Sequence, residues 1–251
     1  MTEPAPHSAP LLDVRGLSAG YGAFQSLFAV DLRVAEGETV AVIGANGAGK
    51  STLLRALAGL VPATAGTVRF AGTDLLALPA HRRVAEGIAL VPEGRLLFPS
   101  LSVEENLLVG AHSRRPGRWS VERVLEVLPV IEPLLARPAG VLSGGESQAV
   151  AIGRALMSNP RLVLFDEVSL GLAPVVVRRL YDALPGVTEG GTTVLIVEQD
   201  ISQALAVADR LVCLLEGRVS LTGAPGAVTR EAITAAYFGR TTTRASGASA
   251  S

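Results

Sequence analysis

The chain has 251 residues, of which 49% are hydrophobic and 18% charged, and its formal net charge is −1. This length suits one large α/β domain or a core domain with an inserted subdomain, and the apolar content excludes a wholly disordered chain. The near-zero charge and the lack of a lysine- and arginine-rich block argue against a nucleic-acid partner. The single cysteine, Cys213, excludes a disulfide within the chain and indicates a reducing compartment.

Neither a transmembrane helix nor a secretory signal is expected. The chain contains no run of about 18 uncharged apolar residues, the length that a membrane-spanning helix needs. The first ten residues, MTEPAPHSAP, lack the basic and apolar regions of a signal peptide. Residues 1–10 and 241–251 are small, polar or proline-rich, so we predict disordered tails on either side of one domain at 11–240.

The predicted elements alternate between strands and helices. The first half of the pattern predicts strands at Leu11–Leu17, Phe28–Val34 and Thr39–Ile43, a helix at about Lys50–Ala58, and strands at Thr67–Phe70 and Ile88–Val91. Between about 93 and 157 the pattern is helical, at Val103–Val109, Val121–Leu128 and Gly145–Met157. Alternation then resumes with Leu162–Phe165, helix Val175–Leu184, Thr193–Val197, helix Ile201–Ala208 and Leu211–Leu215. This order predicts a mostly parallel sheet covered by helices on both faces, with a helical insertion between two core strands.

The strand TVAVI leads directly into the glycine-rich segment GANGAGKST. This segment matches the pattern G-x-x-x-x-G-K-[ST] and comprises Gly44, Ala45, Asn46, Gly47, Ala48, Gly49, Lys50, Ser51 and Thr52. Its backbone N–H groups and the positive end of the following helix can hold phosphate groups. Lys50, the only lysine of the chain, would reach the β- and γ-phosphates, and the Ser51 hydroxyl would bind Mg²⁺. The segment therefore predicts a phosphate-binding site, against the alternative of a glycine-rich turn without a ligand.

Two acids end the apolar run LVLFDE, which is predicted to be a buried strand. A carboxylate at the carboxyl end of a strand can hold Mg²⁺, and the next carboxylate can orient or deprotonate an attacking water. We accordingly assign Asp166 to the metal and Glu167 to the water.

A second anion-binding segment is predicted at LSGGES, directly before a helix. It comprises Ser143, Gly144, Gly145 and Glu146, whose backbone N–H groups would face an anion. The alternative is an ordinary helix cap by Ser143, although a cap does not require two glycines.

The order of GANGAGKST, LSGG and LVLFDE resembles that of the ABC-transporter ATPases, and the resemblance covers about residues 11–239. It implies a P-loop NTPase (RecA-like) core with a mostly parallel sheet, an N-terminal antiparallel β subdomain and an inserted α-helical subdomain at about 93–157. ATP and Mg²⁺ are the cofactors that it implies.

The resemblance also assigns individual residues. Tyr21 matches the aromatic residue that stacks on adenine, with an ordinary turn tyrosine as the alternative. Glu93 stands where most members have a glutamine that contacts Mg²⁺ and the water, and Gln199 where most have a histidine that contacts the γ-phosphate. Ala173 replaces a common aspartate, and Val168 replaces the usual proline after the acidic pair.

Several runs narrow the resemblance to the LivF-type ATPases of branched-chain amino acid importers. These runs are VPEGR, SVEENL, AIGRALMSNPRL, SLGLAP and VEQ. The alternatives are the same role in uptake of urea or a short-chain amide, a soluble ABC ATPase of DNA repair or translation, and a non-hydrolysing regulator. A long coiled-coil insertion or a second cassette would mark the soluble types and is missing, and retention of Asp166 and Glu167 argues against the regulator.

The resemblance implies partners as well. The phosphate loop of one protomer would face the LSGG segment of another, in a head-to-tail heterodimer with a related second ATPase or in a homodimer. The pair would lie at the cytoplasmic face of the inner membrane beneath two transmembrane permease subunits, and would serve a solute-binding protein indirectly. The helical region would dock against a permease, and Arg95–Pro99 offers apolar side chains for that contact, with a buried core turn as the alternative for each of them.

Overall fold

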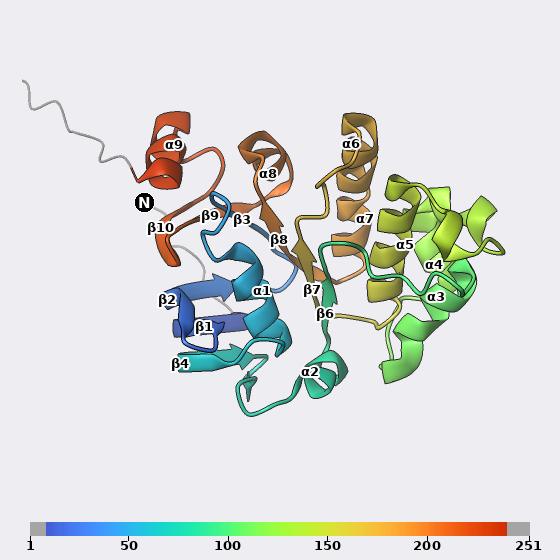
Figure 1. Ribbon diagram of the computed structural model, residues 1–251, viewed down its shortest axis with the longest axis horizontal. Helices are drawn as coiled ribbons and strands as arrows, with labels where there is room; N and C mark the ends of the chain where they lie inside the picture. Colours follow the sequence, from blue (N-terminus) through green and yellow to red (C-terminus); the bar gives the residue numbers. More distant parts are fainter. Residues whose placement is uncertain (1–8, 240–251) are drawn as a thin grey trace, which may run out of the picture.

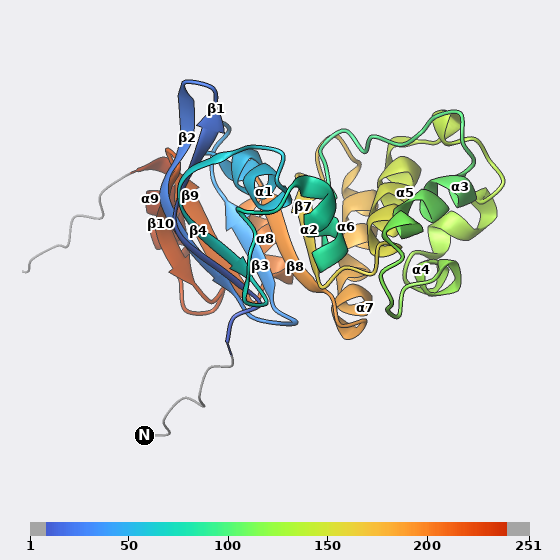
Figure 2. The ribbon, with the colours of Figure 1, turned by 90° about the horizontal axis from the view of Figure 1, so that it is seen from below.

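The computed structural model describes residues 9–239, which form two β-sheets surrounded by helices (Figures 1 and 2). Except for Ala9 and Pro10, the two predicted tails lie outside these residues. No helix in this part of the chain has both the length and the apolar character needed to cross a membrane.

The smaller sheet is antiparallel and has the strand order β2-β1-β4-β5. Its strands are β1 (Leu12–Tyr21), β2 (Phe24–Val34), β4 (Ala63–Phe70) and β5 (Thr73–Asp74). β1 and β2 form a hairpin whose tip pairs Tyr21 with Phe24. β1 ends after the predicted end at Leu17, and β2 begins before the predicted start at Phe28. The added residues near the hairpin tip are largely polar or small and give no alternating apolar pattern.

The larger sheet has the order β10-β9-β3-β8-β7-β6. Its strands are β3 (Thr39–Ile43), β6 (Ile88–Val91), β7 (Leu162–Asp166), β8 (Thr193–Glu198), β9 (Arg210–Leu215) and β10 (Arg218–Gly223). All neighbours are parallel except β10, which is antiparallel to β9. The carboxyl ends of β3, β6, β7 and β8 therefore lie along one edge of the sheet, where α/β folds bind ligands.

The two faces of this sheet carry separate apolar cores. Along β7, Val163 and Phe165 point to one core, and Leu162 and Leu164 point to the other, as the two-residue period of a strand requires. Burial of both faces explains why these strands have continuous apolar sequences.

The helices divide between the two faces. In chain order they are α1 (Lys50–Ala58), α2 (Ala80–Glu86), α3 (Val103–Gly110), α4 (Val121–Val127), α5 (Gly144–Leu156), α6 (Pro174–Asp182), α7 (Leu184–Glu189), α8 (Ile201–Val207) and α9 (Arg230–Phe238). α1 belongs to the core between the two sheets, whereas α5, α6, α7, α8 and α9 contribute to the core on the opposite face.

The predicted helical insertion is confirmed between β6 and β7. α3, α4 and α5, with three short 3-10 helices at Ala111–Ser113, Pro129–Leu134 and Ala139–Val141, follow β6 and precede β7. Both views place α3, α4 and α5 at the end of the molecule opposite β1, β2 and α9 (Figures 1 and 2). The expected P-loop NTPase architecture, with its antiparallel β subdomain, is thus observed.

Besides the three 3-10 helices, five elements were not predicted: β5, α2, α7, β10 and α9. β10 alternates between exposed and half-buried residues at the sheet edge, so it lacks the continuous apolar pattern of the inner strands. The predicted helix Val175–Leu184 corresponds to α6, and α7 begins where it was expected to end. Pro185 lies in the first turn of α7 and cannot donate a backbone N–H to the preceding helix.

The loop after β6 is anchored to α3 by Asn106. Asn106 is fully buried, and its Oδ1 accepts a hydrogen bond from the Phe98 N–H at 2.9 Å. Its Nδ2 donates to the carbonyl oxygens of Phe98 and Ser102 at 3.1 and 2.9 Å. One amide thereby satisfies three backbone groups of a segment without regular structure.

We predict that Asn106→Ala lowers the free energy of unfolding by about 1–3 kcal/mol, because it removes the acceptor of the Phe98 N–H and the hydrogen bonds of a buried amide. Urea denaturation of the purified protein measures the change. Glu104→Gln, an exposed position on the same helix, is the control and should be close to native. A variant Asn106→Ala with the native unfolding free energy would contradict this account.

Candidate nucleotide-binding site

Three glycines shape the predicted phosphate loop between β3 and α1. A Cβ on Gly44 would lie 2.4 Å from the carbonyl oxygen of Leu214, so only glycine fits there. Gly47 and Gly49 have φ angles of 81° and 99°, in the left-handed region that favours glycine. The N–H of Gly217, in the β9–β10 turn, donates to the Ala48 carbonyl at 3.0 Å and holds the loop in place.

The Lys50 side chain folds back over this loop. Its Nζ donates to the carbonyl oxygens of Gly44 and Ala45 at 2.9 and 3.2 Å, and lies 3.3 Å from Oε1 of Glu167. Lys50 is only 4% exposed, and its three N–H donors match these three oxygens in number. The ammonium therefore joins the loop after β3 to the loop after β7.

Ser51 and Asp166 lie together beside the loop. The Ser51 hydroxyl donates to Oδ1 of the fully buried Asp166 at 2.7 Å. Burial raises the pKa of Asp166, while the Ser51 hydroxyl and the Arg55 guanidinium act in the opposite direction. The second oxygen, Oδ2, has no hydrogen-bond partner, and Arg55 Nε is 3.8 Å from it.

These oxygens fit a magnesium ion. Mg²⁺ prefers hard oxygen ligands and is usually held by one or two carboxylates together with substrate phosphates and water. The Ser51 hydroxyl and the unpartnered Asp166 oxygen are ligands of this kind. No cluster of three or more His, Cys, Asp or Glu side chains suited to a metal occurs within residues 9–239.

Glu167 and Gln199 meet at the carboxyl ends of β7 and β8. The Gln199 Nε2 donates to Oε2 of Glu167 at 2.5 Å, while Oε1 of the same carboxylate faces Lys50. Glu167 has a φ of 49°, which is uncommon for a non-glycine residue, and its N–H donates to the Val197 carbonyl at 3.2 Å. The structure thus brings Lys50, Glu167 and Gln199 together, with Gln199 on the carboxylate.

Tyr21 lies at the tip of the β1–β2 hairpin near α1. It is 48% exposed, and its hydroxyl accepts a hydrogen bond from Arg55 at 3.3 Å. Arg55 was missed by the sequence analysis, although its position one turn after Ser51 on α1 places both side chains on the same face of the helix. It links the predicted adenine-stacking residue to Asp166.

Glu93 is exposed, two residues after β6, and its charge acts on Asp166 by raising the pKa of that carboxyl. The loop that carries it is held by α5. The Arg154 guanidinium donates to the carbonyl oxygens of Arg95 and Leu96 at 3.0 and 2.8 Å. Arg95 and Leu96 both have positive φ angles, so Arg154 stabilises an unfavourable backbone.

The predicted second anion-binding segment begins α5. Ser143 and Glu146 form a capping box, in which each side chain accepts from the backbone N–H of the other. A Cβ on Gly145 would lie 2.6 Å from a methyl group of Val176, so this glycine permits close packing of α5 on α6. The segment is not brought to the phosphate loop of its own chain, since α5 lies on the other side of β6 and β7 from α1 (Figure 1).

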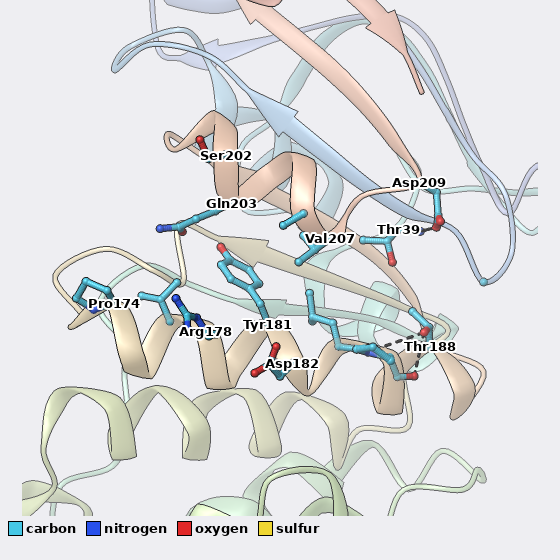
Figure 3. A pocket seen from close by; sticks show the side chains of 15 residues that line it. Thr39, Pro174, Arg178, Tyr181, Asp182, Thr188, Ser202, Gln203, Val207 and Asp209 are labelled. Carbon is cyan, nitrogen blue, oxygen red and sulfur yellow. Dashed lines mark hydrogen bonds between the residues drawn. The ribbon is translucent and has the colours of Figure 1, made fainter. Parts of the chain in front are cut away.

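A cleft of about 800 Å³ opens elsewhere, between α6 and α7 on one side and α8 on the other (Figure 3). Its lining includes Arg178, Tyr181, Asp182, Gln203 and Val207. None of the predicted site residues lines it.

Glu198, the last residue of β8, is a second residue that the sequence analysis missed. It is 1% exposed, and its carboxylate accepts hydrogen bonds from the Ser169 hydroxyl at 2.8 Å and from the Tyr181 hydroxyl. The available signal was a glutamate that ends a fully apolar strand, next to the predicted Gln199.

Known proteins are similar to this chain in sequence. Residues 27–169, more than half of the chain, match the protein family described as "ABC transporter". The high-affinity branched-chain amino acid transport ATP-binding protein BraG of Pseudomonas aeruginosa is 43% identical over 233 residues, which cover 91% of this chain and 100% of BraG. The probable branched-chain amino acid transport ATP-binding protein LivF of Archaeoglobus fulgidus is 34% identical, over 82% of this chain and 89% of LivF.

Two solved structures share the fold. A nucleotide-free ATP-binding cassette from an ABC transporter superposes with a TM-score of 0.77 at 28% identity, covering 90% of this chain and 94% of the cassette. A dimeric ATP-binding cassette in a post-hydrolysis state, bound to ADP and Pi, gives a TM-score of 0.74 at 28% identity, covering 85% of this chain and 98% of that one.

We predict that Lys50→Ala and Lys50→Arg lower the affinity for ATP by at least about tenfold and abolish hydrolysis, because the point charge beside the phosphates is lost or displaced. Titration with a fluorescent ATP analogue and phosphate release measure the two effects. Arg178→Gln removes an exposed cation from the cleft between α6 and α8 and should leave both unchanged. Native hydrolysis by either Lys50 variant would contradict the assignment.

Proposed function

This chain is a member of the ABC transporter family of ATP-binding proteins and is an ABC ATPase, and we propose on that premise that it energises a membrane importer of branched-chain amino acids. The observation that carries the proposal is the junction of Lys50, Glu167 and Gln199 beside the phosphate loop, together with the similarity to BraG along nearly the whole chain.

We assign the steps of hydrolysis to the backbone and side-chain groups of this site. The backbone N–H groups of Gly44–Thr52 bind the phosphates of ATP, and Lys50 contacts the β- and γ-phosphates. Glu167 accepts a proton from the attacking water, and Gln199 orients the carboxylate and donates to a γ-phosphate oxygen. Ser51 and Asp166 would hold Mg²⁺, which when bound offsets the negative charge of the phosphates.

One oxygen of the Glu167 carboxylate faces Lys50 and the other accepts from Gln199. The triphosphate carries more negative charge than one carboxylate, so we expect bound ATP to draw the Lys50 ammonium toward the phosphates.

A single chain leaves the LSGG segment of Ser143–Glu146 away from its own phosphate loop, which supports a head-to-tail dimer. In that arrangement the segment of one protomer closes the nucleotide site of its partner. The partner is either a related second ATPase or a second copy of this chain. The dimeric cassette bound to ADP and Pi is a solved example of a related pair.

The membrane partners would be two permease subunits at the cytoplasmic face of the inner membrane. The loop after β6 exposes Leu96 and Phe98, at 67% and 48%, and α3 exposes Leu108 at 51%. These side chains suit a helix of a permease as the docking partner, and Arg154 connects their loop to α5. A signal from the permease would thus reach both Glu93 and the LSGG segment.

We predict that Glu167→Gln binds Mg-ATP and accumulates as an ATP-bound dimer, because the closed site forms while the water is no longer deprotonated. Size-exclusion chromatography with and without ATP detects it. The double variant Lys50→Ala, Glu167→Gln should remain monomeric in ATP and serves as the control. Retained turnover with an unchanged elution volume would exclude Glu167 from this role.

We also predict ATP-dependent uptake of leucine, isoleucine and valine by the reconstituted transporter. The complex of this chain with its permeases is placed in proteoliposomes together with the solute-binding protein, and uptake of radiolabelled solutes is compared. Glu167→Gln supplies the inactive control. Uptake of urea or a short-chain amide in place of leucine would assign the transporter to the other substrate class.

A further inference from the structure

The buried carboxylate of Glu198 has no cationic partner among the salt bridges of the described residues. A carboxylate in such surroundings is costly unless hydrogen bonds compensate for the lost water. Here the donors are the Ser169 hydroxyl on one oxygen and the Tyr181 hydroxyl on the other. Burial raises the pKa of Glu198, and these two donors oppose the rise. Burial and the nearby carboxylate raise the pKa of Tyr181, so its hydroxyl remains a donor.

The two donors come from different elements. Ser169 belongs to the loop after β7 and lies two residues beyond Glu167, whereas Tyr181 belongs to α6. Glu198 itself directly precedes Gln199. The carboxylate at the end of β8 is therefore the point at which that loop, α6 and the Gln199 backbone are joined.

These links form a closed circuit around Glu167. From Glu167 the chain leads to Ser169, whose hydroxyl donates to Glu198, and the next residue, Gln199, donates back to the Glu167 carboxylate. Glu167 holds a left-handed backbone conformation with φ at 49°. Such a conformation persists only where the surrounding structure imposes it, and the circuit is an arrangement of this kind.

We propose that Glu198 is a positioning residue for ATP hydrolysis, which holds the Glu167 carboxylate in place through Ser169 and Gln199. The inference rests on the proposed role of Glu167 as the group that accepts the proton from water. Tyr181 acts one step further out, by holding the other oxygen of Glu198.

The alternative is that Glu198 only attaches α6 to the sheet. The two carboxylate oxygens of Glu198 distinguish these roles. Oε2 accepts from Ser169, in the loop that follows Glu167, and Oε1 accepts from Tyr181 of α6. Figure 3 shows the Tyr181 ring in the cleft between α6 and α8, with its hydroxyl end toward Gln203. The ring contributes to packing through its carbon atoms, so Tyr181→Phe removes the donor and preserves the ring.

The test uses the complete transporter and measures kcat and KM for ATP together with the midpoint of thermal unfolding. Ser169→Ala and Glu198→Gln should lower kcat by roughly tenfold at an unchanged KM for ATP, because a misplaced carboxylate affects the chemical step and not nucleotide binding. Ser169→Thr restores a hydroxyl and should return kcat to near the native value. Asp182→Asn, an exposed position in the same cleft, is the matched control and should be native in every measurement.

A second comparison separates the loss of positioning from a general loss of stability. In a Glu167→Gln background the residual rate should not fall further when Ser169→Ala is added, because the carboxylate that Ser169 positions is already absent. Three results would each overturn the proposal. The first is a turnover rate in the double variant that falls by the full factor seen for Ser169→Ala alone. The others are a native kcat in Ser169→Ala and a lowered kcat that Ser169→Thr does not restore. Retained turnover in Glu167→Gln alone would instead overturn the proposed role of Glu167, so the two failures are distinguishable.

Discussion

The buried ammonium of Lys50 is the interaction on which the site depends. It connects the carbonyl groups of Gly44 and Ala45, after β3, with Glu167, after β7. Because β8 lies between these two strands in the sheet, the same carboxylate can reach Gln199 at the end of β8. One cation thus brings the ends of three parallel strands into a single polar cluster. A guanidinium is planar and delocalised, and it cannot present three donors around one compact centre in this way.

Sheet order explains how distant sequence segments can share this cluster. β6 and β7 are neighbours in the sheet although α3, α4 and α5 separate them along the chain. The insertion therefore does not separate Asp166 and Glu167 from the phosphate loop. At the same time Arg154 connects the insertion to the loop after β6, so its movement would change the surroundings of Glu93.

The fold was largely predictable because its inner strands are continuously apolar and its helices have clear starts, as at Lys50 and Ser143. The sequence analysis missed β10 and α9 because both lie at the edge, where partial exposure weakens the apolar pattern. Gly44–Thr52 and the pair Asp166 and Glu167 were recognisable as local patterns. Arg55, Ser169, Tyr181 and Glu198 were missed, because their roles come from contacts between elements.

The contact between Gly217 and Ala48 has a consequence for synthesis of the chain. The Gly217 N–H holds the phosphate loop from the β9–β10 turn, and its carbonyl accepts from Phe28 of β2. Segments near residues 28, 48 and 217 must therefore all be present before the loop has its final support. A ribosome-bound chain that has released only the phosphate loop and the acidic pair still lacks this support. Nucleotide binding would thus be acquired late in translation, which limits premature ATP binding by incomplete chains.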